Sequence, residues 1–274
     1  MKRPLLALSL LVAASISSCQ SVVPEGARSV EVTAGAAWSA LDGSVAASDF
    51  DAAGALRGST LDELGIGDRQ SIGQLALRMT GGDASWDFFA QQAGYSGVGA
   101  LADDLTIEGV ELRFDEGEVR TDLDIGVYGL RWLKPISSNG QLDVNIGASL
   151  LLAELDLEFE QGVEDPVTGD PTGELKTTGR DVLLPIPLPA LDVVYDGELF
   201  DAHLILSGMK VWGHDATGHV IDLDFNVSVA VFDDLGELVV GYRELELELE
   251  HSDDERAEID VSLSGPYLAY RLSF

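Results

Sequence analysis

Apolar and polar residues alternate along most of the chain after residue 30. In residues 220–232, apolar side chains fill every second position and polar or small side chains fill the positions between. Residues 142–151 repeat the pattern, with Leu142, Val144 and Ile146 opposed by Asp143 and Asn145. Because successive side chains of a strand point to opposite faces, this alternation predicts strands that are apolar on one face only.

Ten such segments are separated by clusters of Gly, Asp, Asn and Pro, which favour turns. The expected strands cover residues 30–47, 70–80, 84–94, 118–133, 141–160, 182–195, 199–212, 218–232, 237–250 and 257–274. Alternate connections are short, namely "TGGD", "LKPISSNG", "YDGE" and "DDLGE", whereas 48–69, 95–117 and 161–181 are long. Short turns at one end and long loops at the other are typical of outer-membrane barrels.

The pattern therefore predicts an all-β fold, a closed antiparallel transmembrane β-barrel of about ten strands that occupies residues 30–274. Counts of eight or twelve are also compatible with it. Alternation alone does not separate a barrel from a soluble β-sandwich, because the apolar face packs inward in a sandwich and meets lipid in a membrane barrel. An exported β-sandwich lipoprotein therefore remains an alternative.

The long connections carry expectations of their own. Residues 161–181 are rich in Pro, Gly, Asp and Thr, and we expect a mobile extracellular loop. Residues 95–117 contain "LTIEGVELRFDEG", which could form a small extra hairpin above the membrane or, if it spans, raise the strand count to twelve. Residues 59–68 suggest a short helix capped by Ser59 or Thr60.

Two features interrupt the regular pattern. Pro185, Pro187 and Pro189 cannot donate ladder hydrogen bonds, so they indicate a rim, a bulge or loosened pairing. The apolar positions also change parity in 244–250, as they do late in 141–160. Either a bulge or a strand that leaves the membrane and packs its apolar face inward would produce that change.

The N-terminus predicts export. Residues 1–18 combine a basic start with an apolar stretch, which is typical of a signal peptide, and 19–29 form a short linker. The sequence "ISSC" resembles a bacterial lipobox and makes Cys19 a candidate for lipidation. Cys19 is the only cysteine, so no disulfide can form within the chain. No later run of 18 apolar residues could form a transmembrane helix.

Charge narrows the partners. The chain has 48 Asp and Glu against 16 Lys and Arg, a net charge of -32, which argues against nucleic acid because phosphates need a basic surface. The partners that remain are outer-membrane lipid, the barrel-assembly machinery and a small solute.

The C-terminal region supplies a resemblance. The stretch "VVGYRELELELEHSDDERAEIDVSLSGPYLAYRLSF" is similar to the end of an uncharacterised group of Gram-negative outer-membrane β-barrel proteins, which share a Gly-Tyr-Arg and a Gly-Pro matched here by Gly241 to Arg243 and Gly265 to Pro266. The last strand also resembles the signal read by the barrel-assembly machinery, matched by Leu268, Tyr270, Leu272 and Phe274. The resemblance implies fold and location and carries no activity.

Charged residues at lumen-facing positions are candidates for a structural network. Asp222, Asp224, Arg243 and Arg271 all fall on the predicted inner face. An unpaired buried ion costs several kcal/mol, so we expect these four to form ion pairs that brace the barrel. A polar pore or a ligand contact is the alternative role for the same residues.

No catalytic set is evident, and we expect no enzymatic activity, cofactor or metal. A barrel hydrolase is the least favoured alternative, with His214, Asp215 and His219 in an outer loop, or His203 and Ser207 on one strand face, as its candidates. A ten-stranded barrel encloses little space, which favours a structural or surface-interaction role with a largely filled polar lumen. A narrow channel for small solutes is the main alternative.

Overall fold

The structure is a computed structural model that describes residues 29–49, 59–61, 66, 70–99, 105–107, 110–112, 118–164, 171–212, 216–231, 236–252 and 255–274. The expected signal peptide, residues 1–18, and the lipidation candidate Cys19 lie outside these ranges. Strands dominate the described part of the chain, and it contains no helix. A helix long and apolar enough to cross a bilayer is accordingly not found there.

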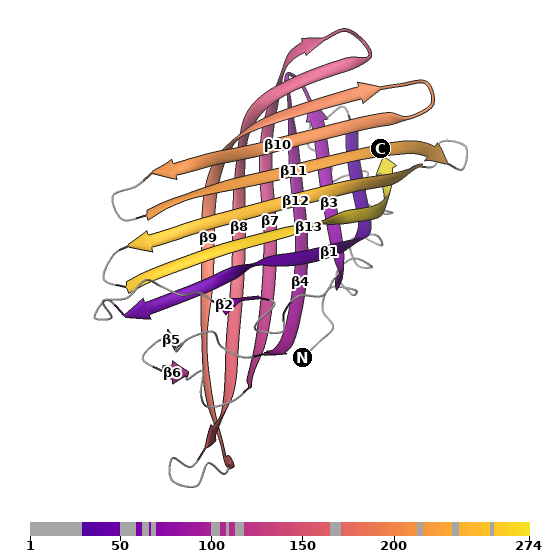
Figure 1. Cartoon of the computed structure of the whole chain (residues 1–274). Coiled ribbons are helices and arrows are strands. Elements are labelled where there is room, and N and C mark those ends of the chain that lie inside the picture. The colour runs from indigo at the N-terminus through magenta and orange to yellow at the C-terminus, as the bar shows by residue number, and fades with distance from the viewer. Residues whose placement is uncertain are drawn as a thin grey trace.

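Ten long antiparallel strands form one closed sheet (Figure 1). They are β1 (Ser29–Asp49), β3 (Gln70–Gly81), β4 (Ala84–Gly99), β7 (Val119–Ser138), β8 (Leu142–Glu164), β9 (Pro171–Asp196), β10 (Asp201–Trp212), β11 (Ala216–Val231), β12 (Gly236–Ser252) and β13 (Glu255–Ser273). The first and last strands pair from Glu31–Ser273 to Asp49–Glu255, which closes the sheet. The predicted ten-stranded barrel is confirmed, and a two-sheet sandwich is excluded.

The barrel is strongly sheared. In Figure 1, β10 to β13 and β1 run across the front, and β9, β8, β7, β4 and β3 run steeply behind them. The hairpin of β8 and β9 extends well beyond its neighbours at the bottom of the view. Each of the ten expected strands overlaps an observed one, because alternation identifies the central part of each strand.

Short turns mark one end of the barrel. Gly82 and Asp83 join β3 to β4, residues 139–141 join β7 to β8, and residues 197–200 join β9 to β10. The start of β1 and the end of β13 lie at this same end, where Val30 and Phe274 exchange backbone hydrogen bonds of 2.9 and 3.1 Å. Short turns and both termini belong on the periplasmic side of an outer-membrane barrel.

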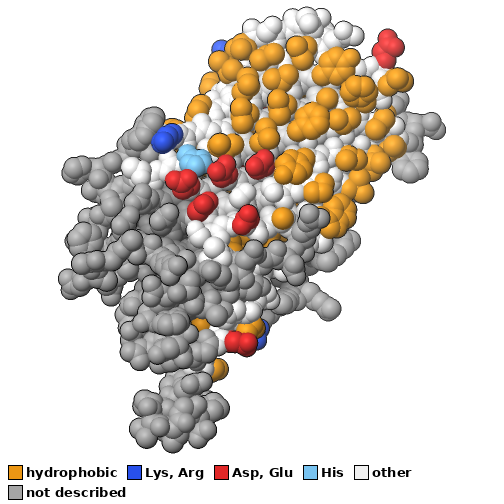
Figure 2. Space-filling model, in the orientation of Figure 1, with side chains coloured by type: hydrophobic (Ala, Val, Ile, Leu, Met, Phe, Trp, Pro, Cys, Tyr) orange, Lys and Arg blue, Asp and Glu red, His pale blue; other side chains and the backbone are white. Residues whose placement is uncertain are grey.

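Between this end and mid-barrel, the outer wall is apolar. Ile221, Phe225 and Val229 on β11 are 39–45% exposed, whereas the alternate Asp222 is fully buried inside. Trp86 and Trp132 add an aromatic pair with ring centroids 6.5 Å apart. Figure 2 shows the resulting apolar band on the front wall. A closed barrel whose exposed wall is apolar and whose lumen is polar spans a membrane, here the outer membrane.

Beyond the band, the pattern inverts. On β12, the outward Val240 and Tyr242 are followed at the same parity by Glu244, Glu246 and Glu248, while Leu245 and Leu247 are 7% and 3% exposed inside. The pairing of β12 with β11 and with β13 continues through this point without a shift, so there is no bulge. The strand therefore leaves the membrane and buries its apolar face inward, which confirms that alternative.

The same inversion occurs on β8. Leu150 is 40% exposed on the outer wall, and the outward positions after Leu152 are Glu154, Asp156 and Glu158. The inner face above this level carries Leu155 at 7% and Phe159 at 0% exposure. On the front wall, acidic side chains gather along the lower edge of the apolar band in Figure 2. We call the apolar-walled part the membrane zone and the acid-coated part the projecting zone.

Three prolines end one ladder early. The β9 ladder with β8 is unbroken from Leu175 to Tyr195. Because an antiparallel ladder needs N–H groups from alternate residues, Pro185, Pro187 and Pro189 must turn their nitrogens away from β8 and toward β10. The β9–β10 ladder begins at Asp196–Asp201 and stops at Ala190–Ser207, directly before Pro189. The prolines thus mark loosened pairing on one edge of β9.

The prediction of a loop at 161–181 is wrong for most of these residues. Strand β8 continues to Glu164, and β9 begins at Pro171, so a long hairpin replaces most of the loop. These residues have few apolar side chains, because the hairpin extends past the barrel core. Backbone pairing between the two strands holds it instead.

The expected helix at 59–68 is not capped as predicted. Ser59 and Thr60 form β2 (Ser59–Thr60), which pairs with Val45 and Ser44 of β1. Residues 62–65 and 67–69 lie outside the described ranges. In the next long connection, β5 (Leu105–Ile107) and β6 (Val110–Leu112) form a separate two-stranded sheet. The hairpin suggested at 95–117 is therefore present and is not part of the barrel wall.

Candidate functional site

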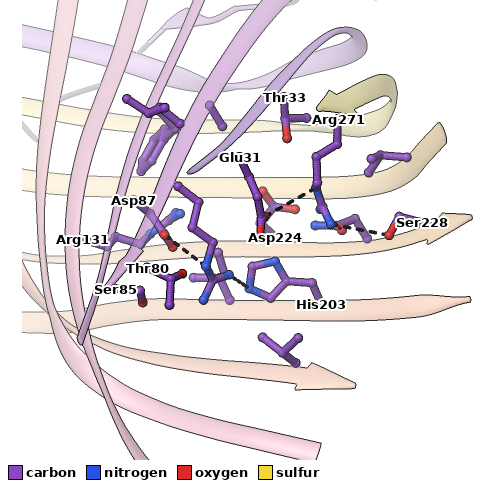
Figure 3. Close-up of a pocket in the computed structure, with 18 of the residues that line it drawn as sticks. Glu31, Thr33, Thr80, Ser85, Asp87, Arg131, His203, Asp224, Ser228 and Arg271 are labelled. Atoms are coloured by element: carbon purple, nitrogen blue, oxygen red, sulfur yellow. Dashed lines mark hydrogen bonds and ion pairs between the residues drawn. The ribbon is translucent and has the colours of Figure 1, made fainter. Parts of the chain in front are cut away.

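The lumen of the membrane zone contains a polar cavity of about 490 Å³. It extends from the periplasmic turn at Gly82 and Asp83 to the guanidinium groups of Arg131 and Arg243. Its walls come from inward positions on both the front and the back strands (Figure 3). We call this cavity the vestibule, because it lies at the periplasmic end of the barrel.

A buried ionic group closes the inner end of the vestibule. Asp222 on β11 is fully buried and accepts hydrogen bonds from Arg131 Nη2 at 2.6 Å and Arg243 Nε at 3.0 Å. The two guanidinium carbons also lie 4.2 and 4.1 Å from the ring centre of Phe89. Both guanidinium groups are therefore within cation–π distance of the ring. We call Asp222, Arg131, Arg243 and Phe89 the plug.

A second ionic group lies nearer the vestibule wall. Asp192 on β9 is fully buried and accepts hydrogen bonds from Arg78 Nη2 at 2.7 Å and from Asn145 Nδ2 at 2.9 Å. Its other oxygen contacts His203 Nε2. Arg78 Nε also lies 3.5 Å from Asp87 Oδ1. One group therefore joins five strands, β3, β4, β8, β9 and β10, and the buried charge of Asp192 is paired with Arg78, as burial requires.

A third group surrounds Arg271 near the seam between β1 and β13. Arg271 Nη1 donates to Glu237 Oε2 at 3.1 Å, and Nη2 donates to Asn226 Oδ1 at 3.2 Å. Its Nε lies 4.0 Å from Glu31 Oε2 on β1. Arg271 therefore connects β13 to β1, β11 and β12, so the closing seam is crossed by side chains as well as by the backbone ladder.

The four predicted lumen residues all point inward, and the structure distributes them over separate groups. Asp222 and Arg243 are paired in the plug. Asp224 instead accepts a hydrogen bond of 2.7 Å from Tyr267 Oη, and Arg271 pairs with Glu237. The predicted bracing effect on stability remains a prediction.

Several members of these groups were missed from the sequence. Asp87 and Arg131 lie at inward positions of β4 and β7 and could have been found by their parity. The pairing of Arg131 with Asp222 could not be predicted, because the two residues are 91 positions apart and meet only across the closed lumen.

The hydrolase candidates are described only in part. His203 and Ser207 both face the lumen rather than the lipid, and His203 is held by Asp192 and Arg78. His219 lies on the outer wall, 3.0 Å from Glu246 and 3.1 Å from Glu248. His214 and Asp215 lie outside the described residues. Among the residues that are described, no group of three or more His, Cys, Asp or Glu is placed to hold a metal.

The residues that resemble an assembly signal lie on the outer wall of the final strand. Leu268 is 43% exposed, and Phe274 is 59% exposed directly beyond the strand. Tyr270 and Leu272 are half-buried at the same parity. They form part of the apolar band, and recognition by the assembly machinery remains a prediction.

No family model matches the chain, and no curated protein matches its sequence. Among solved structures, it is similar to the toluene transporter TodX of P. putida, at 9% identity over 92% of this chain and 91% of that one, with a TM-score of 0.33. Ail, the attachment invasion locus protein of Yersinia pestis, shows 9% identity over 87% and 97%, with a TM-score of 0.28. The transport unit of the autotransporter AIDA-I from Escherichia coli shows 10% identity over 96% of each chain, with a TM-score of 0.35. With scores below 0.5, the fold assignment rests on the closed strand pairing itself.

Proposed function

We propose that this chain is a non-conducting outer-membrane barrel that anchors a rigid, acid-coated extension of its own strands for contacts at the cell surface. The observation that carries the proposal is the filling of the lumen. The plug closes the polar vestibule, and apolar side chains fill the barrel interior beyond it. This arrangement supports a structural or surface-interaction role over a narrow channel.

The interior beyond the plug is lined by buried apolar side chains. Val127, Leu151 and Ala153 are at most 2% exposed, and Phe159 higher on β8 is fully buried. These side chains project from β7 and β8 and belong to one continuous cluster with residues from β1, β4, β12 and β13. Hydrated ions would have to cross this packed apolar layer even if the plug opened.

Planar-bilayer recording tests the closed lumen. The purified barrel should insert without stable conductance steps. The double variant with Arg131→Ala and Arg243→Ala loses the inner wall of the vestibule but keeps the apolar layer. The barrel should therefore remain closed to ions. Reproducible single-channel steps from the unmodified protein would contradict the proposal and favour the narrow channel.

Surface labelling tests the projecting zone. A cysteine introduced as Glu158→Cys on the outer wall of that zone should react with a membrane-impermeant maleimide on intact cells. The matched Asp143→Cys, at the periplasmic end, should react only after the outer membrane is permeabilised. The unsubstituted chain supplies the background from Cys19. Reversed labelling would place the projecting zone in the periplasm and reject a surface role.

A further inference from the structure

The vestibule carries more negative than positive charge. Eight of its lining residues are Asp or Glu and four are Arg. Three of those arginines are already paired with Asp192 or Asp222, which are fully buried and outside the lining. The cavity surface therefore has an excess of carboxylates over available cations.

Part of this excess lies at the periplasmic mouth. Asp143, Asp196 and Asp201 come from the ends of β8, β9 and β10, beside the short turn that joins β9 to β10. Asp196 and Asp201 pair directly across the β9–β10 ladder. Carboxylates brought this close favour a cation at the entrance.

A second observation comes from deeper in the vestibule. Asp87 on β4 is 7% exposed and lines the cavity, and Figure 3 shows it within the lining. Its Oδ1 faces Arg78 Nε at 3.5 Å, but its Oδ2 accepts no hydrogen bond from any described residue. Arg131, opposite it on β7, donates to Asp222 instead. A buried carboxylate oxygen without a donor is costly, so it favours a ligand that donates.

We propose that the vestibule binds a small organic cation with protonated amino groups, which enters from the periplasm and donates to Asp87. An ammonium group supplies three donors and no acceptor, which suits a cavity lined by carboxylates, hydroxyls and amide oxygens. A cavity of about 490 Å³ is within the size range of small-molecule sites. The described carboxylates do not converge as metal ligands do, which favours an amine over a metal ion.

The plug determines what happens to the bound solute. Among the described residues, Arg131 and Arg243 line the inner end of the vestibule, so the solute enters from the periplasmic end in this proposal. The solute is therefore held and released on one side of the membrane. This binding goes beyond the proposed surface role and does not depend on it.

Calorimetric titration of putrescine into the folded barrel in neutral detergent micelles tests the site. We expect saturable binding that weakens as salt rises, because screening reduces the attraction between amine and carboxylate. Asp87→Asn should weaken binding about tenfold or more, the effect of losing a charged hydrogen-bond partner. Asp122→Asn removes one charge from the outer wall and should leave the affinity unchanged.

A second variant tests the site even if Asp87→Asn fails to fold. Thr80→Trp places a large side chain at the cavity mouth, beside the exposed turn, and should reduce binding while heat-modifiable gel migration stays normal. Magnesium chloride at matched ionic strength should produce no Asp87-dependent heat. The proposal is overturned by absence of saturable binding, by equal affinity in Asp87→Asn, or by magnesium binding that depends on Asp87. None of these outcomes would alter the conductance result.

Discussion

The two zones of the barrel use the same strands with opposite chemistry. On β12, Val240 faces outward in the membrane zone, and Glu246 faces outward at the same parity in the projecting zone. The inner face changes in the reverse sense, from Arg243 to Leu245 and Leu247. Since the ladder is continuous, the backbone is not what changes. The difference reports the solvent outside the wall, which is lipid in one zone and water in the other.

The comparison also shows how each zone is stabilised. In the projecting zone, apolar burial inside the barrel drives packing, as in a soluble protein. In the membrane zone, the outer apolar side chains gain little from contacting one another through lipid, so the strands are held together by their closed backbone ladder and by polar contacts in the lumen. The three arginine groups provide such polar contacts between strands.

The largest effect should come from breaking the plug. Asp222→Ala leaves Arg131 and Arg243 without their shared carboxylate and should reduce the free energy of unfolding by about 3–5 kcal/mol. Guanidinium unfolding in detergent, followed by heat-modifiable gel migration, measures this change. Glu158→Ala, on the outer wall of the projecting zone, is the control and should change stability by at most about 0.5 kcal/mol. Equal effects from both variants would show that the lumen pairs do not stabilise the barrel.

The zone boundary predicts that a lysine introduced on the outer face of β12 lowers stability in the membrane zone and not in the projecting zone. Val240→Lys puts a charge on the lipid-facing wall and should destabilise the barrel by about 2–4 kcal/mol if the site is near the bilayer midplane. Glu246→Lys makes a similar change six residues further along the same face and should be nearly neutral in that measurement. Unfolding of both variants from the same lipid vesicles is the comparison. Similar losses of stability in both variants would show that β12 has no zone boundary between these two positions.

The smallest effect concerns charge on the projecting zone. Burial, together with Glu248 and Glu246, raises the pKa of Asp260 above its usual 3.8. The folded barrel therefore binds this proton more tightly than the unfolded chain, and stability falls as pH rises through the raised value. Asp260→Asn should stabilise the barrel by at most about 0.5 kcal/mol at neutral pH and have no effect below about pH 4. Thermal unfolding at both pH values measures this, and a gain that persists in acid would have another cause.

Much of the wall was predictable, because alternation records which face of each strand meets an apolar environment. The parity change in residues 244–250 even indicated the projecting zone. Residues 171–181 were assigned to a loop because they carry no alternation, and only their pairing with β8 makes them a strand. Ser59 and Thr60 look like helix caps locally, yet contact with β1 determines their structure.

The lumen was predictable in composition but not in pairing. Inward parity identified Asp222 and Arg243, and the same rule would have identified Arg131. Which charges meet depends on how far each strand is displaced along its neighbour around the whole barrel. That displacement places Arg78 against Asp192, which lies 114 residues away, and Tyr267 against Asp224. No local pattern records it.

The proline edge of β9 has a consequence for how the barrel comes apart. The β9–β10 ladder spans only Ala190 to Asp196 on β9, whereas the ladder that joins the first and last strands extends along nearly all of β1. Under heat or pulling force, rupture should therefore begin between β9 and β10 and spread outward, while the terminal junction separates late. The weakest point of this cylinder lies in the middle of the chain, at a place set by three residues that cannot donate a hydrogen bond.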